Sequence, residues 1–174
     1  RGIINSTTGQ QDKLDAFMKL AHEFGAGVVG LAIDENGVAA TSDAKLEIGM
    51  RTLAAADENG VPTEDIYLDP IILPVNCSQD APGIVLETIA QFKMLCDPAP
   101  HVVIGLSNLS QGASERPLIN RTFLVMAIAA GLDASIHDPL DEELTNSMIT
   151  AELLLNKTIY SDSYLAAYRK GKAV

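Results

Sequence analysis

The sequence of 174 residues predicts an α/β fold built on a parallel β-sheet. Short apolar runs alternate along the chain with longer segments in which apolar residues recur about every 3.6 positions, the pattern of strands followed by amphipathic helices. The short runs are continuously apolar, as expected for parallel strands that are buried on both faces. Together, the two patterns favour a succession of βα units.

Five of the short apolar runs are predicted to be strands. They cover residues 2–5, 27–33, 66–72, 102–107 and 132–136. Residues 34–43 and 73–82 follow two of these strands and are rich in Gly, Pro, Asn, Asp and Ser. Both segments are therefore predicted to be loops.

Apolar residues at helical spacing predict a helix after each strand. The first helix is marked by Leu14, Phe17, Met18 and Ala21, the second by Leu46, Met50, Leu53 and Ala54, and the third by Val85, Ile89, Phe92 and Leu95. The fourth covers about 117–130, and the fifth begins at Asp141. We expect Gly25, Gly60 and Gly131 to follow helices in a left-handed conformation, and Asp97-Pro98 to end the third helix.

Two architectures accommodate five βα units. A (β/α)8 barrel takes eight units, and this chain opens directly in a strand without an initiator Met. We therefore expect residues 1–174 to be the C-terminal portion of a single TIM-barrel domain, supplying about five units. The alternative is a complete doubly wound sheet, which should carry a glycine-rich phosphate loop after its first strand. The segment Asn5-Ser6-Thr7-Thr8-Gly9 is not such a loop.

Composition and charge narrow the function classes. The net charge of -11 argues against nucleic-acid binding, which needs clustered Lys and Arg. No apolar run approaches the roughly 20 residues of a membrane span, and no signal peptide is found, so we expect a cytoplasmic protein. Cys77 and Cys96 lack CxxC or Cys/His spacing, which favours reduced thiols over a disulfide or metal site. No metal site is predicted.

Three polar residues are expected at the ends of predicted strands. They are Asn5, Asp69 and Asn108, and in α/β barrels side chains from several strand ends converge at the carboxyl edge of the sheet. The Asp69 carboxylate is suited to accept two parallel N–H bonds from the amidine-like edge of a flat heterocycle, and the Asn5 amide offers a donor and an acceptor. The alternative role for both residues is turn formation.

The segment around Asn108 contains neutral hydrogen-bonding groups. Gly105 would let a flat ligand approach the backbone. Ser107, Asn108 and Gln111 suit a reaction in which charge changes on a ring nitrogen and no strong acid is needed. Arg116 is placed to hold a carboxylate or to close the loop, or else it is a solvated side chain near a helix start.

Other polar residues carry weaker predictions. His137 and Asp138 follow the last strand, but adjacent side chains in an extended chain point in opposite directions, so a structural role is favoured. Asp34 ends a predicted strand and is a weaker candidate for lining the cleft. The hydroxyl residues 6–8 are candidate N-caps of the first helix.

Several strings of residues together resemble the pterin-binding methyltransferases. They are Asn5-Ser6-Thr7, Leu68-Asp69-Pro70-Ile71-Ile72-Leu73-Pro74, Gly105-Leu106-Ser107-Asn108-Leu109-Ser110-Gln111, Arg116-Pro117-Leu118-Ile119-Asn120-Arg121-Thr122-Phe123 and Ala129-Ala130-Gly131-Leu132-Asp133-Ala134. The resemblance covers essentially the whole chain and is greatest to the methyltetrahydrofolate:corrinoid/iron–sulfur protein methyltransferases of acetyl-CoA-forming anaerobes. The wider superfamily includes the folate domain of cobalamin-dependent methionine synthase and dihydropteroate synthase.

The resemblance implies a fold, a reaction and a site. Members are (β/α)8 barrels, usually homodimers, that move a methyl group from N5 of methyltetrahydrofolate to the Co(I) corrinoid (cobalamin) of a separate corrinoid/iron–sulfur protein. By resemblance, Asn5 and Asp69 would hydrogen-bond the pterin, and Asn108 would contact N5 and stabilise its developing charge. Gln111 and Arg116 would line the site. A second pterin-binding aspartate of the family would precede the first residue of this chain.

Three alternative functions stay open at this point. A corrinoid-linked demethylase methyltransferase would run the transfer towards tetrahydrofolate. A dihydropteroate synthase-like enzyme would need a pyrophosphate site, and its family has a Lys where Ser107-Asn108 stands here. The third alternative is a non-catalytic folate-binding module.

Overall fold

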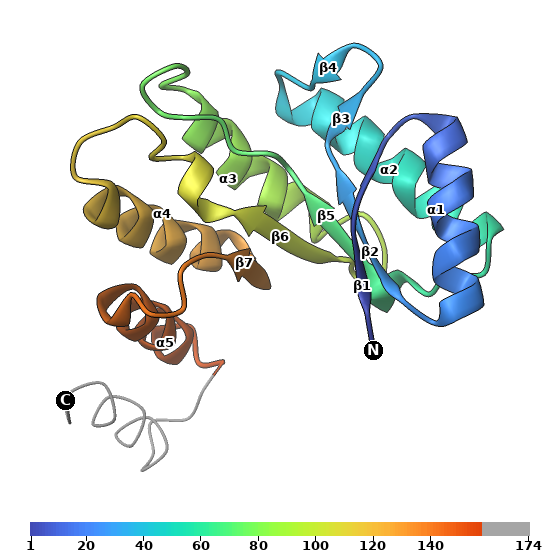
Figure 1. The fold of residues 1–174 in the computed structure, drawn as a ribbon. Coiled ribbons are helices and arrows are strands. Elements are labelled where there is room, and N and C mark those ends of the chain that lie inside the picture. Colours follow the sequence, from blue (N-terminus) through green and yellow to red (C-terminus); the bar gives the residue numbers. More distant parts are fainter. Residues whose placement is uncertain (158–174) are drawn as a thin grey trace.

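The computed structural model describes residues 1–157 and contains a five-stranded parallel sheet with helices packed against it (Figure 1). The strands are β1 (Ile3–Thr8), β2 (Gly27–Leu31), β5 (Ile66–Asp69), β6 (His101–Gly105) and β7 (Ala134–Ile136). The five predicted strands are confirmed, and only their ends are shifted.

Five α-helices lie within residues 1–157, and they confirm the predicted helices. They are α1 (Gln11–Phe24), α2 (Ser42–Glu58), α3 (Ala81–Phe92), α4 (Arg116–Ala130) and α5 (Glu142–Leu154). Two 3₁₀ turns, η1 (Thr63–Asp65) and η2 (Leu106–Asn108), precede β5 and follow β6. The glycines that follow α1, α2 and α4 have φ angles of 58°, 70° and 115°, so the predicted left-handed caps are confirmed.

Three local predictions were wrong. Helix α3 ends at Phe92, before Leu95 and Asp97-Pro98, and Lys93 ties the following segment back through its bond to the Pro100 carbonyl at 2.8 Å. The predicted loop 34–43 contains all but the first residue of a small antiparallel hairpin, β3 (Ile33–Asp34) and β4 (Gly37–Val38).

The N-cap prediction for residues 6–8 also failed, because these residues continue β1 and Gln10 precedes helix α1. Their hydroxyl groups are therefore part of the strand and do not accept bonds from the first turn of the helix.

The strand order separates the two predicted architectures. Neighbouring strands follow chain order, β1-β2-β5-β6-β7. A doubly wound sheet has a switch point at which the order reverses, and this sheet has none within residues 1–157. Consecutive strands in chain order, with helices on the outside, are the arrangement of a (β/α)8 barrel. The barrel-type prediction is confirmed, and the doubly wound alternative is wrong.

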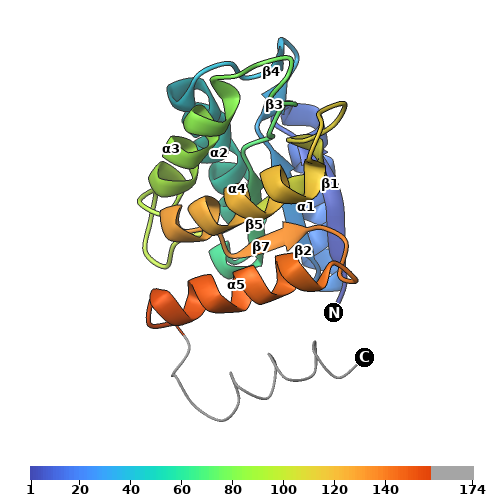
Figure 2. The same ribbon diagram turned by 90° about the vertical axis from the view of Figure 1, so that its left-hand side faces the viewer.

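The hydrophobic core lies between the sheet and the helices, which cover one face of it (Figures 1 and 2). Val28, Leu68 and Ile104 point into this core and are almost fully buried. A Cβ atom on Gly30 would lie 2.7 Å from the side chain of Thr52 in α2, so this glycine also faces the helices. We call this side of the sheet the outer face.

The opposite side, which we call the inner face, carries the alternate residues of each strand. A Cβ atom on Gly27 would lie 3.4 Å from the Tyr67 ring and 3.5 Å from Ile3. Tyr67 in turn stacks on His101, with ring centroids 4.9 Å apart. These four residues mark the inner face, and side chains two positions further along each strand point the same way.

Helix α5 follows β7, the last strand of the sheet. It packs against α4, and an ion pair between Arg121 and Glu143 joins the two helices. Figure 2 shows α5 lying alongside α4. The first turn of α5 is capped by Asp141, whose side chain accepts the N–H of Leu144 at 3.0 Å.

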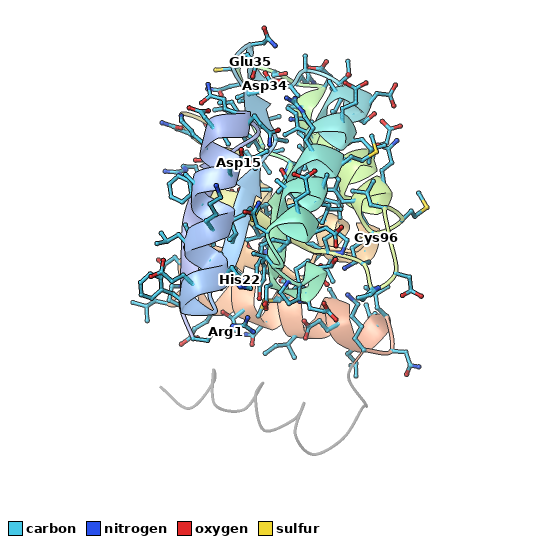
Figure 3. All side chains as sticks on the ribbon, turned by 90° about the vertical axis from the view of Figure 1, so that its right-hand side faces the viewer. Arg1, Asp15, His22, Asp34, Glu35 and Cys96 are labelled. Carbon is cyan, nitrogen blue, oxygen red and sulfur yellow. The ribbon has the colours of Figure 1, made fainter. Side chains whose placement is uncertain are left out.

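The two ends of the sheet can be followed in Figure 3. Asp34 and Glu35 lie near the carboxyl ends of the strands, while Arg1 and His22 lie near the amino ends. Arg1 is ion-paired with Asp65, directly before β5. None of the helices in residues 1–157 is long and apolar enough to cross a membrane.

The packing of α2 on α3 provides a stability test. A Cβ atom on Gly49 would lie 2.8 Å from the ring of the buried residue Phe92, so Gly49→Ala should overpack the core. We expect the free energy of unfolding to fall by about 1–3 kcal/mol, although Ala is the better helix former. Urea denaturation of the full-length protein measures this change.

The matched control is Gly83→Ala in α3, where an added Cβ meets nothing within 4 Å. The free energy of unfolding of this variant should rise by about 0.5–1 kcal/mol. A similar gain for Gly49→Ala would contradict the described contact between α2 and α3.

Candidate functional site

Asn5 and Asp69 lie at a similar level of the inner face. Asn5 pairs with Val29, which pairs with Tyr67, and Asp69 lies two residues beyond Tyr67 on the same face. In an eight-stranded barrel of shear eight the level shifts by about one residue per strand, because the strands are tilted. Two strand steps separate β1 from β5. The tilt therefore shifts the level by about two residues, which is the distance along β5 from Tyr67, the residue in register with Asn5, to Asp69.

The position of Asn5 within its strand differs from the prediction. It is the third residue of β1, which continues to Thr8, so it does not end the strand. The register shifts directly after Asn5, between Asn5 and Thr7. The side chain of Asn5 is exposed and therefore accessible from the inner face.

Asp69 ends β5 as predicted, and its carboxylate is held by the backbone. Only 9% of the residue is exposed, and its Oδ1 atom accepts the N–H of Ile71 at 2.8 Å. The turn-forming role and an inner-face position thus occur together. Burial raises the pKa of Asp69 to about 6, while the Ile71 N–H and the charge of Lys45 act in the opposite direction.

A buried lysine that the sequence analysis missed lies beside this carboxylate. Lys45, in the first turn of α2, is 3% exposed, and its Nζ atom donates to the Pro70 carbonyl at 2.6 Å. Burial lowers the pKa of Lys45 to about 8, and the nearby charge of Asp69 opposes that shift. The signal in the sequence was its helical spacing from Ile48 and Thr52, which are buried on the same side of α2.

Asn108 lies one short turn beyond β6, in η2, and is exposed. Its amide nitrogen lies 3.2 Å from the position that a Cβ atom on Gly105 would occupy. The absence of a side chain at Gly105 therefore leaves room for the Asn108 amide against the inner face. The Asn108 carbonyl accepts the N–H of Gln111 at 3.1 Å, which places Gln111 in the next turn.

Arg116, at the start of α4, closes the loop that carries these residues. Its Nε atom donates to the Ser110 hydroxyl at 3.1 Å, and its NH2 group donates to the Ser107 carbonyl at 3.2 Å. Of the predicted roles, closing the loop is the one that these bonds support. Arg116 thus holds both ends of the segment from Ser107 to Ser110, which contains Asn108.

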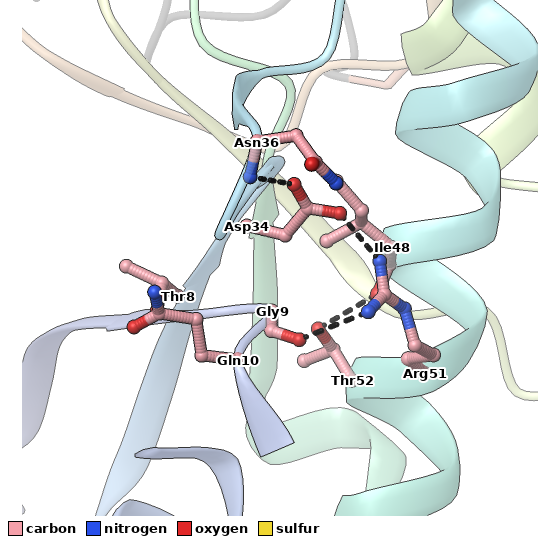
Figure 4. A network of polar contacts seen from close by, with 8 residues as sticks. All are labelled: Thr8, Gly9, Gln10, Asp34, Asn36, Ile48, Arg51 and Thr52. Atoms are coloured by element: carbon pink, nitrogen blue, oxygen red, sulfur yellow. Dashed lines mark hydrogen bonds and ion pairs between the residues drawn. The ribbon is translucent and has the colours of Figure 1, made fainter. Parts of the chain in front are cut away.

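Asp34 belongs to the hairpin and not to the five-stranded sheet. Its carboxylate accepts the N–H of Asn36 at 2.9 Å and is ion-paired with Arg51 of α2 at 2.8 Å (Figure 4). Both contacts hold its pKa below the usual value. Arg51 also donates to the Gly9 carbonyl at 3.3 Å, so the group fastens the hairpin and the end of β1 to α2.

The remaining polar candidates show local roles. Asp138 accepts the N–H of Leu140 at 2.9 Å, which agrees with the favoured structural role. The Nδ1 atom of His137 is buried without a hydrogen-bond partner among residues 1–157. Cys77 and Cys96 are free and exposed, and no group of three potential metal-ligating side chains occurs in the described part of the chain.

The inner face therefore combines exposed amides with one constrained carboxylate. Asp69 can accept N–H groups, and the amides of Asn5 and Asn108 can each donate and accept. Ionised carboxylates form the stronger bonds, since charge-assisted hydrogen bonds are roughly twice as strong as neutral ones. This donor and acceptor set suits a flat polar heterocycle.

Comparison with known proteins gives the family. The model of the pterin binding enzymes matches residues 1–137. The methylcorrinoid:tetrahydrofolate methyltransferase of Eubacterium limosum is 24% identical over 175 residues, covering 98% of this chain and 64% of that protein. The methionine synthases of Mycobacterium leprae and Mycobacterium tuberculosis are 34% and 35% identical over 148 and 149 residues, covering 78% of this chain and 12% of each protein.

The chain thus spans less than two thirds of the length of these relatives. The family match extends from β1 to the end of β7 and includes Asn5, Asp69 and Asn108. By this match over most of its length, the chain belongs to the pterin-binding enzymes.

Proposed function

We propose that this chain forms the pterin-binding part of a methyltransferase that moves a methyl group between N5 of a tetrahydrofolate and the cobalt of a corrinoid. Family membership supports the pterin, and the name of the Eubacterium limosum relative supports both the folate and the corrinoid. The observation that carries the proposal is the common inner-face position of Asn5, Asp69 and the Asn108 turn.

In this proposal Asp69 recognises the amidine edge of the pterin. Its carboxylate accepts the N3–H and 2-amino protons, while Asn5 binds a neighbouring part of the ring that carries both donors and acceptors. Ser107, Gln111 and the Gly105 backbone complete the substrate-binding surface, and Arg116 keeps their loop closed. Asp69 must be ionised for this role, because a protonated carboxyl loses acceptor capacity.

Asn108 is the proposed catalytic residue. A tertiary amine is a poor leaving group unless its nitrogen is protonated or strongly hydrogen-bonded. The Asn108 amide lies against Gly105, and in this proposal it hydrogen-bonds N5 and stabilises the charge that changes there during transfer. The amide is a modest donor, so its effect depends on a fixed orientation before reaction.

The direction of transfer is a separate part of the proposal. We favour transfer from methyltetrahydrofolate to a Co(I) corrinoid carried by a corrinoid/iron–sulfur protein, with a homodimeric, cytoplasmic enzyme, on the resemblance of the motifs. The name of the Eubacterium limosum relative supports the second candidate, transfer from a methylcorrinoid to tetrahydrofolate. Both directions pass through the same transition state, so the roles of Asn5, Asp69 and Asn108 are unchanged.

Stopped-flow measurement with the full-length protein tests the function. Mixing with methyltetrahydrofolate and free Co(I) cobalamin should consume Co(I), and mixing with methylcobalamin and tetrahydrofolate should regenerate it. The ratio of the two rates gives the preferred direction. Tight folate binding without turnover in either direction would instead support the non-catalytic module.

Asp69→Asn should mainly weaken folate binding. The amide would present a donor to the pterin N–H groups, and loss of a charged hydrogen bond costs about 1.5–3 kcal/mol, or roughly 10- to 100-fold in Kd. Isothermal titration with methyltetrahydrofolate measures the change. Asp65→Asn is the matched control, because Asp65 is also 9% exposed but lies before β5, at the opposite end of the strand. Equal affinity of the Asp69 variant and the control would refute the assignment.

Asn108→Ala should lower the rate of methyl transfer much more than it lowers folate affinity. Removing one preorganised donor typically costs about 10²-fold in rate, since the bond is strongest in the transition state. Single-turnover stopped-flow kinetics and titration separate the two effects. The control is Asn59→Ala, where the lost amide caps α2 at the far end of the sheet. Parallel losses of rate and affinity would argue against a transition-state role.

A further inference from the structure

We propose that Lys45 is a positioning residue of the pterin site, which fixes the turn after β5 and keeps the Asp69 carboxylate charged for pterin binding. The inference rests on the proposed role of Asp69. It assigns a function to a buried cation that lies on helix α2 and not on one of the strands of the sheet.

Lys45 is buried, and its ammonium group has hydrogen-bond partners. A lysine is almost never fully buried unless its ammonium group is paired or hydrogen-bonded. Here the residue is 3% exposed, and Nζ donates to the Pro70 carbonyl at 2.6 Å and, more weakly, reaches the Ile71 carbonyl at 3.5 Å. Both carbonyls belong to the two residues directly after Asp69.

The turn after Asp69 has an unusual backbone conformation. Ile71 has a φ angle of 53°, in the left-handed region that a β-branched residue rarely adopts. Such a conformation is strained and persists only where its surroundings hold it. The bonds from Lys45 to the carbonyls and from the Ile71 N–H to Asp69 hold it from both sides. Loss of the Lys45 ammonium would therefore make the turn less rigid, and with it the Ile71 N–H that orients the Asp69 carboxylate.

The charge of Lys45 also favours the ionised form of Asp69. Burial raises the pKa of Asp69 to about 6, and the Lys45 ammonium opposes this rise. The strand beside β5 places the apolar residue Leu31 opposite Asp69, and His101 lies on β6 beside Tyr67, further from the carboxyl end. Asp80, before α3, lines the same cavity of about 170 Å³ as Lys45. Within the described chain, Lys45 is thus the cation that acts on Asp69.

These contacts predict how binding depends on pH. Between the pKa of Asp69, about 6, and that of Lys45, about 8, the carboxylate is ionised and the ammonium is still charged, so folate affinity is highest in this range. As the pH falls through about 6, the carboxyl gains a proton and affinity decreases. Removal of the Lys45 charge leaves the desolvation of Asp69 unopposed, which moves the midpoint of this decrease to higher pH.

Lys45→Met is the test, because methionine fills a similar volume without the charge or the donors. Titrations of the full-length protein with methyltetrahydrofolate from pH 5 to pH 8 should show the midpoint of the fall in affinity at a higher pH than in the wild type. Affinity at pH 7.5, where most of the wild-type Lys45 is still charged, should also fall, by about tenfold, because the turn is no longer held. An unchanged midpoint and affinity would overturn the proposal.

The matched control is Lys93→Met. Lys93 also donates to a carbonyl, that of Pro100 at 2.8 Å, and to a carboxylate, that of Asp133 at 2.9 Å, near the amino ends of β6 and β7. Its loss should destabilise the fold without moving the pH midpoint. Lys45→Gln retains a donor but no charge, and it provides the midpoint measurement where the methionine variant does not fold.

A double-mutant cycle separates this inference from the proposed function. If Lys45 acts through Asp69, Lys45→Met should change affinity little when Asp69 is already asparagine. Additive losses would show that Lys45 acts elsewhere. An Asp69→Asn variant that binds folate normally would refute the role of Asp69 itself, whereas a weakened Asp69→Asn beside a normal Lys45→Met would refute only the role of Lys45.

Discussion

The one-sided packing of the sheet is the constraint on which the site depends. In each strand the residues that point outwards, such as Leu68 and Ile104, pack against the helices and form the core. Alternation then assigns the intervening residues to the inner face, where no helix of the described chain covers them. Polar groups such as Asn5 can lie there at no cost to the core, so the fold itself separates the residues that give stability from those that can bind a ligand.

Lys45 and Asp69 lie where the residues that stabilise the fold meet those that can bind a ligand. Lys45 belongs to the core side of α2, while Asp69 ends a strand and faces inwards. Burying opposite charges is not in itself a strong source of stability, because desolvation offsets much of their attraction. The lysine is better understood as fixing one turn, Pro70 to Ile71, at a place where the backbone departs from its preferred conformation. This is the kind of strain that persists where the surrounding structure specifies a site.

Periodicity in the sequence was sufficient for the strands and helices, but not for the faces of the helices. Leu46, Met50, Leu53 and Ala54 mark a helix correctly, yet Met50 and Ala54 are exposed, and the buried side of α2 is formed by Lys45, Ile48, Gly49, Thr52, Ala55 and Ala56. A stripe of small and polar residues has little hydrophobic signal, and a lysine is ordinarily assigned to the surface. The hairpin β3–β4 was missed because two-residue strands carry no recognisable period. Asp69 at the end of β5 and the turn after β6 were more predictable, because in both places an apolar run is followed directly by polar residues, whereas Asn5 was wrongly expected to end β1.

In the proposed function the protein would bind both the methylated and the unmethylated folate, and the chemistry of the candidate site is consistent with this requirement. The amidine edge of the pterin is the same in both forms, so a charged acceptor such as Asp69 can bind it without favouring either. N5 alone changes, and near it a fixed charge would stabilise one form over the other. A neutral amide such as that of Asn108 can donate or accept and so tolerates both states. In the proposed function, a charged anchor and a neutral residue beside the reacting nitrogen would bind both forms of the folate, and the direction would be left to the relative stability of the two methyl carriers.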